Sequence, residues 1–181
     1  MLLLASQVWQ CLYLELLDGA EFLAEQLVAN NDTPDTRFML GYVQNRRGQH
    51  SSAIVTCEGY IEQHVGCLWV FSQACLKLDK ITRGLNALDA NRTLWWTTDK
   101  DTLFSAMGRD LFSPSGFFLL YANLHNKLDH EAALEYYTIS ARLNPFLFEN
   151  VRALAKSTMA VPDRKSVVLG KECRSRWSPY H

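Results

Sequence analysis

The sequence predicts an all-α protein in which antiparallel helix pairs stack into a superhelical solenoid. Residues 117–145 show the unit most clearly: two apolar helical faces are joined by a short polar turn and ended by Asn144-Pro145. Related pairs recur along the chain in one register. A single pair cannot bury both of its apolar faces, so neighbouring pairs must cover them. Such arrays bind proteins more often than they catalyse reactions.

The composition fits a folded protein without a strong surface field. Of 181 residues, 48% are hydrophobic and 20% are charged, with a net charge of −1. This balance argues against a nucleic-acid-binding protein. The five cysteines are odd in number and lack paired metal spacing, which favours free thiols in a reducing compartment. No apolar run approaches the roughly 20 residues of a membrane span, and we expect a soluble intracellular protein.

The first helix pair is expected at about 2–13 and 19–29, with Asp18-Gly19 marking the turn. Small and medium residues share one side of its second helix, which allows close approach of the partner helix. They are Ala20, Ala24 and Leu27.

Thr33-Pro34 predicts an N-cap and a first-turn proline for the second pair. The first helix of that pair carries Leu40 and Gly41, and Gly48 is suited to a left-handed turn before the next helix. In the third pair, Gly84 lies at the position that alanine occupies in the other pairs. Because a helical glycine costs about 1 kcal/mol relative to alanine, either the packing there is unusually close or the helix is locally weak.

The internal spacing is the strongest support for a repeat. Four residues at one position of the unit are each followed, twelve positions later, by alanine or glycine. The second members are separated by 33, 31 and 49 residues. Two of these separations lie near the period of about 34 residues that is typical of tetratricopeptide repeats, and the third predicts an insertion. The pairs are Val8 and Ala20, Gly41 and Ala53, Ser72 and Gly84, and Tyr121 and Ala133.

The insertion is expected at about 91–114, as an irregular connection with one short helix around 102–107. Ser113-Pro114 then begins the fourth pair, in which Leu120, Ala133 and Tyr137 pack and Pro145 ends the unit. A further helix is expected over 146–159. We therefore predict a repeat domain over 1–160 and a basic, aperiodic tail over 161–181 that is disordered or non-native.

With this register, three stretches resemble the N-terminal tetratricopeptide-repeat domain of subunit 3 of the anaphase-promoting complex, or cyclosome, in the cell division cycle protein 27 family. The first is Val8-Trp9-Gln10 together with 20–27, the second is 38–42, and the third is 143–150, where Asn-Pro-Phe precedes apolar and aromatic residues.

The resemblance implies a non-catalytic scaffold in the nucleus and cytoplasm that forms a homodimer and assembles with other subunits of this ubiquitin ligase. It implies no cofactor, small-molecule substrate, nucleic acid or membrane partner. Aromatic residues at helical spacing, Phe22 among them, are expected in the core. The first helix is apolar on several sides, and we expect a second copy of the chain to cover it. The expected interface residues are Leu2, Leu3, Leu4, Trp9 and Tyr13.

Two alternative functions remain. A tetratricopeptide adaptor that clamps a partner's C-terminal carboxylate needs basic side chains on consecutive first helices, and Arg37 is a candidate. An enzyme would need a site in the 91–114 insertion, where no nucleophile and base can be paired. His125 and His130 flank the fourth turn but lack the spacing of a metal site, and Asp129 is better explained as a helix cap.

Overall fold

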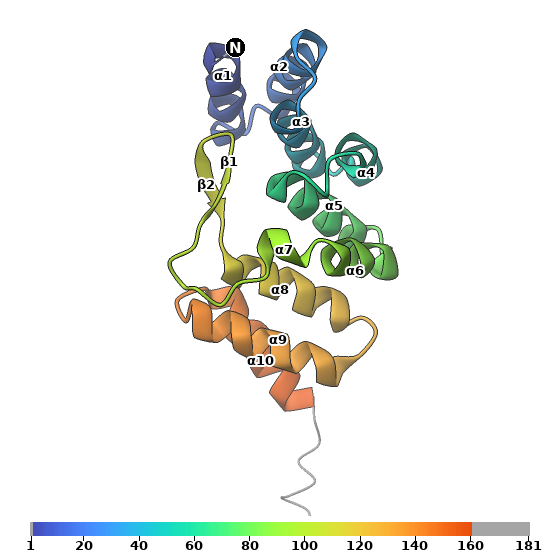
Figure 1. Cartoon of the computed structure of the whole chain (residues 1–181), viewed down its shortest axis with the longest axis vertical. Coiled ribbons are helices and arrows are strands. Elements are labelled where there is room, and N and C mark those ends of the chain that lie inside the picture. Colours follow the sequence, from blue (N-terminus) through green and yellow to red (C-terminus); the bar gives the residue numbers. More distant parts are fainter. Residues whose placement is uncertain (1, 161–181) are drawn as a thin grey trace, which may run out of the picture.

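The computed structural model describes residues 2–160, apart from the side chains of Leu2, Asp110 and residues 157–160. Its helices stack in antiparallel pairs that follow one another in a curved array (Figure 1), which confirms the all-α tetratricopeptide solenoid. The first three pairs are α1 (Leu2–Tyr13) with α2 (Leu17–Asn30), α3 (Pro34–Arg46) with α4 (His50–Glu58), and α5 (Val65–Lys77) with α6 (Ile81–Ala90). The fourth is α8 (Pro114–His125) with α9 (His130–Leu143), followed by α10 (Phe148–Ala160).

The three side-chain caps that the sequence predicts are present, and His64 caps a further helix, α5, by accepting the Cys67 amide. Thr33 and Thr36 form a reciprocal capping box at α3, with Pro34 in the first turn. The Ser113 hydroxyl accepts the Gly116 amide at α8. At α9 the Asp129 carboxylate accepts two backbone N–H groups, so this residue is a cap and not a metal ligand.

A left-handed residue follows the first helix in each of the first three pairs. Gly48 has φ 81°, as expected, and Glu15 and Asp79 take φ values of 57° and 58° at the equivalent positions. In each turn the next amide bonds back to a carbonyl five residues earlier, as in a Schellman motif. The prediction of a turn at Asp18-Gly19 is therefore wrong, because α2 already begins at Leu17 and Asp18 lies in its first turn.

The 91–114 insertion contains a one-turn helix and a β-hairpin. Helix α7 (Arg92–Trp95) buries Trp95, whose indole N–H donates to the Leu88 carbonyl at 2.9 Å. Strands β1 (Phe104–Ala106) and β2 (Arg109–Phe112) then pair antiparallel around a two-residue turn. The short helix expected around 102–107 is wrong. Met107 and Gly108 both have positive φ, which fits a tight hairpin turn and not a helix.

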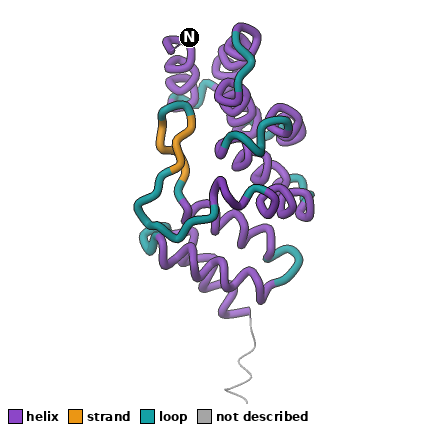
Figure 2. The backbone as a smooth tube through the Cα atoms, viewed as in Figure 1, coloured by secondary structure: helices purple, strands orange, loops and turns teal. Residues whose placement is uncertain are grey.

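The core consists of buried clusters that follow one another along the array, and the largest of them includes part of the hairpin. One buried cluster joins α1, α2 and α3, and a larger one extends from α3 to α8 and takes in Ala106 and Phe112 of the hairpin. Figure 2 shows this hairpin as the strand segment beside the purple helices. The predicted tail over 161–181 lies outside the described residues. Within residues 2–160, no helix is long and apolar enough to cross a membrane.

Candidate interaction surfaces

The side chains considered for metal binding or catalysis are engaged in the fold. His125 packs against the rings of Tyr121 and Tyr136, at 4.5 and 5.1 Å between centroids. The Nδ1 atom of His130 lies 2.6 Å from the Asn126 amide oxygen. Among the described residues, no three His, Cys, Asp or Glu side chains gather as metal ligands. Burial raises the pKa of the Cys75 thiol to about 11, which suppresses its thiolate.

The expected interface residues of α1 divide into two groups. Leu3 and Tyr13 are 74% and 88% exposed. Leu4 and Trp9 are only partly exposed, because both pack on the buried cluster of the first helices. The Trp9 ring lies 6.3 Å from Phe38 and 5.5 Å from Tyr42. Leu2 begins the helix, and its side chain is outside the described set.

Three apolar residues next to this helix are exposed and were not predicted. Leu14 and Leu16 lie in the α1–α2 turn, with exposures of 55% and 56%, and Phe22 on α2 is 61% exposed. The expectation that Phe22 belongs to the core is therefore wrong. The sequence contains the signal, since Phe22 lies about 200° around the helix from Ala20 and thus opposite the small-residue side. We call the exposed large apolar residues of the first pair, together with those of its turn, the first-pair patch. They are Leu3, Tyr13, Leu14, Leu16 and Phe22.

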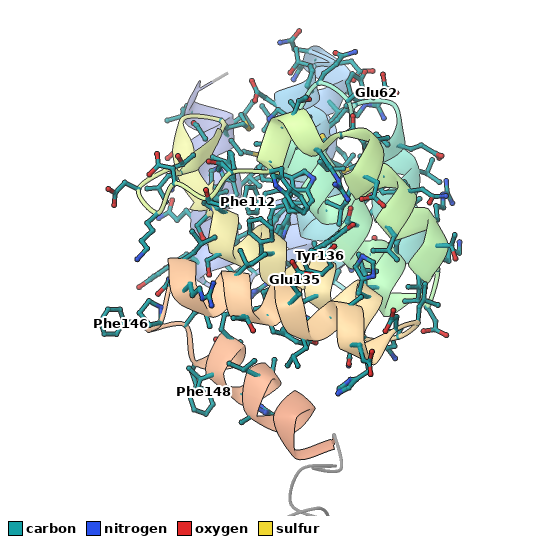
Figure 3. All side chains as sticks on the ribbon, turned by 60° about the horizontal axis from the view of Figure 1, so that its bottom comes forward. Glu62, Phe112, Glu135, Tyr136, Phe146 and Phe148 are labelled. Carbon is teal, nitrogen blue, oxygen red and sulfur yellow. The ribbon has the colours of Figure 1, made fainter. Side chains whose placement is uncertain are left out.

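Nearly all residues expected to pack within the repeats are buried. Pro145 is the exception: it is exposed, between the end of α9 and the start of α10. The adjoining Phe146 and Phe148 are 94% and 69% exposed and project from the body in Figure 3. The buried residues are Ala20, Ala24, Leu27, Leu40, Gly41, Ala53, Ser72, Gly84, Leu120, Ala133 and Tyr137.

The hairpin lies on the face of the array formed by the first helices, α1, α3, α5 and α8, which we call the inner face. In Figure 1 it extends from the start of α8 up to α1. The Phe112 ring packs between Phe38 of α3, Trp69 of α5 and Phe117 of α8, with centroid separations of 5.8, 5.1 and 6.2 Å. Figure 3 shows Phe112 among the helices, in contrast to Phe146. The chain's own hairpin therefore contacts all four first helices of the inner face.

A polar cavity of about 630 Å³ lies between α8, α9 and α10. Arg152 and Lys156, one turn apart on α10, line it together with Asn123 of α8 and Asn126, the residue that follows α8. Its other lining residues include Glu149.

Arg37, the candidate for a carboxylate clamp, forms two hydrogen bonds of 2.6 Å with the Asp32 carboxylate.

Comparison with known proteins agrees with this architecture. Residues 10–91 match the family model for the anaphase-promoting complex, cyclosome, subunit 3. The chain is 30% identical over 158 residues to Protein bimA of Emericella nidulans, covering 81% of the chain and 19% of that protein. It is 21% identical over 174 residues to the anaphase-promoting complex subunit 3 of Schizosaccharomyces pombe, covering 91% of the chain and 26% of that protein. The chain thus spans about a fifth to a quarter of these relatives.

Solved structures support the same fold. A double mutant of MamA RS-1 superposes with a TM-score of 0.69 at 14% identity, covering 98% of this chain and 96% of that one. A tetratricopeptide protein of Thermus thermophilus gives 0.66 at 16% identity, with coverages of 87% and 80%. The Cut9–Hcn1 hetero-tetramer of the anaphase-promoting complex gives 0.64 at 17%, with coverages of 81% and 27%. The resemblance seen in the sequence is confirmed by the family model and by the Schizosaccharomyces pombe subunit.

Proposed function

We propose that this tetratricopeptide-repeat chain, which is related to subunit 3 of the anaphase-promoting complex, is a non-catalytic scaffold that pairs with a second copy of itself. In this role it would help to assemble that ubiquitin ligase in the nucleus and cytoplasm through contacts with other subunits. The match of residues 10–91 to the subunit 3 family model and the relation to the Schizosaccharomyces pombe subunit support the choice of complex. The pairing itself is supported by the surface of the first helix pair.

The first-pair patch is the observation that carries the proposal. Its residues belong to one helix pair and the turn within it, and each is more than half exposed. Exposed apolar side chains that gather in one region of a folded protein commonly mark a protein interface. Tyrosine and phenylalanine contribute strongly to such interfaces because each buries a large rigid surface at low entropic cost.

A second copy of the chain is a suitable partner for this patch. In a closed two-fold dimer the same patch meets itself, so one set of apolar residues covers both exposed surfaces. The net charge of −1 adds little repulsion between two copies. By contrast, the inner face, which a carboxylate clamp would need, is contacted by the hairpin on all four first helices, and Arg37 is already paired with Asp32.

Dimerisation is tested with a Tyr13→Glu, Phe22→Glu variant of the 181-residue chain. Each carboxylate would be desolvated in the interface, so the dimer dissociation constant should rise at least about tenfold, equivalent to about 1.4 kcal/mol. Sedimentation or light scattering over a concentration series gives this constant. Both residues are strongly exposed in the single chain, so the fold should be retained.

The matched control is Val55→Glu on α4, where the valine is 76% exposed and lies outside the first pair. This variant should dimerise as the original chain does. A chain that stays monomeric at hundreds of micromolar would refute the proposal. If the double variant dimerises unchanged, the interface lies elsewhere.

A further inference from the structure

We infer that the inner face of the array is a binding site for an extended segment, and that the chain's own hairpin is the ligand that occupies it. The main anchor is Phe112, which is 6% exposed. Its ring fills a slot whose walls come from three different helix pairs, namely Phe38, Trp69 and Phe117. An aromatic side chain inserted into a slot formed by rigid helices is typical of the anchor of a bound peptide.

Two further anchors hold the hairpin along the same face. The guanidinium of Arg109 lies over the Trp9 ring of α1, 5.3 Å from its centroid. Met107, at the tip, packs on the buried clusters of the first helices and borders a cavity of about 260 Å³ that Ala5 of α1 and Leu27 of α2 also line. Its φ of 53°, unusual for a residue with a side chain, belongs to the tight turn that it forms with Gly108.

The hairpin has the properties of a docked segment more than those of a framework element. Two short strands without further pairing are at most marginally stable in water, so this hairpin depends on the face beneath it. Its sides differ: Ala106 and Phe112 are buried, whereas Leu103 and Leu111 are 55% and 38% exposed. It also lies in the insertion that interrupts the regular succession of helix pairs.

These contacts define the chemistry of a ligand for the site. It would be an extended strand or hairpin with an aromatic residue for the central slot, a guanidinium for Trp9 and an unbranched apolar side chain for the end near α1. A tethered segment has an effective concentration in the millimolar range. A free segment of this kind therefore binds only when the hairpin is undocked, and a partner that uses the inner face must displace it.

The test uses a variant in which residues 103–112 are replaced by glycine and serine, leaving Trp95 and the Ser113 cap in place. We call this variant the opened chain. The probe is a fluorescent synthetic peptide of residues 102–113. The opened chain should bind it saturably, and the intact chain should not bind it at the same concentrations. A peptide with Phe112→Ala should bind at least about tenfold more weakly, because its main anchor is missing.

A second variant covers the case in which the opened chain loses its helical circular dichroism. Phe112→Ala with Arg109→Ala in the full chain keeps the length and the turn but weakens docking, and it should acquire peptide binding. The inference is overturned if the opened chain is folded and binds no peptide, if intact and opened chains bind equally, or if neither variant acquires binding. Dimerisation is measured on the intact chain and does not enter these outcomes, so the two proposals fail separately.

Discussion

At the scale of single residues, the absence of a side chain at two glycines sets how closely the helices approach. A β-carbon built on Gly41 would lie 2.3 Å from the Cys57 sulfur, across the α3–α4 contact. One built on Gly84 would lie 3.1 Å from the β-carbon of Cys75 and 3.2 Å from a methyl group of Leu124. Close packing thus explains the helical glycine at 84, and it compensates for the weaker helix propensity.

Gly41→Ala should destabilise the chain by about 1–3 kcal/mol, because the added methyl group overpacks a buried contact by more than the alanine gains in helix propensity. Urea denaturation followed by circular dichroism measures the change. Cys57→Ala in the same chain removes the opposing sulfur and should restore most of the loss. Gly59→Ala is the control, since its β-carbon would meet nothing within 4 Å. Equal stability of Gly41→Ala and the original chain would contradict this account.

At the scale of elements, a buried polar network fixes α10 on the fourth pair. The Asn150 amide nitrogen donates to the Ser115 hydroxyl of α8 at 3.0 Å, and the Ser140 hydroxyl of α9 donates to the Asn150 oxygen at 2.8 Å. All three residues are buried. Hydrogen bonds require one particular placement, whereas the apolar contact of Leu154 with the cluster around Tyr137 tolerates sliding.

Asn150→Ala should cost about 1–3 kcal/mol and loosen α10 first, because the hydroxyl groups of Ser115 and Ser140 each lose one buried hydrogen-bond partner and keep only their bonds to one another. Hydrogen exchange should show faster exchange of the amides of 150–156 than of those in α8. Val151→Ala, at a neighbouring position that is 49% exposed, serves as the control and should leave exchange nearly unchanged. Unaltered protection of α10 in Asn150→Ala would show that apolar packing alone holds this helix.

At the scale of the whole molecule, the hairpin connects repeats that a simple solenoid leaves out of contact. In such arrays each unit touches only its neighbours, and stability is a sum over adjacent interfaces. Here the hairpin follows the third pair, yet it contacts Trp9 in the first pair and Phe38 in the second. It therefore couples the stability of the two ends of the array.

Replacing residues 103–112 by glycine and serine should accordingly make unfolding less cooperative. In the intact chain, urea transitions followed by circular dichroism and by tryptophan fluorescence should coincide. In the opened chain they should separate or show a smaller dependence on denaturant, because the first pairs unfold without the last. Leu103→Ser, at an exposed hairpin position, is the control and should behave as the intact chain. Coincident transitions of unchanged steepness in the opened chain would argue against this coupling.

The helix pairs, their register and most of their buried residues follow from the sequence alone. Residues that contact one another within a pair are close in the chain, so the twelve-residue spacing and the caps at Thr33, Ser113 and Asp129 determine them locally. The exposure of Phe22 could also have been read from its angle on the helix. The expected dimer interface stays a prediction.

Only the tertiary structure decided what the insertion does. Over 102–107 the periodicity is too short to distinguish a helix from a strand, and its residues become a hairpin because Phe112, Met107 and Ala106 find burial on helices up to a hundred residues away. Trp9, which the sequence places at the dimer interface, also packs within the chain, against Phe38 and Tyr42 of α3. Long-range burial of this kind has no local signal in the sequence, because the free energy that stabilises it comes from a surface that exists only after the helices have stacked.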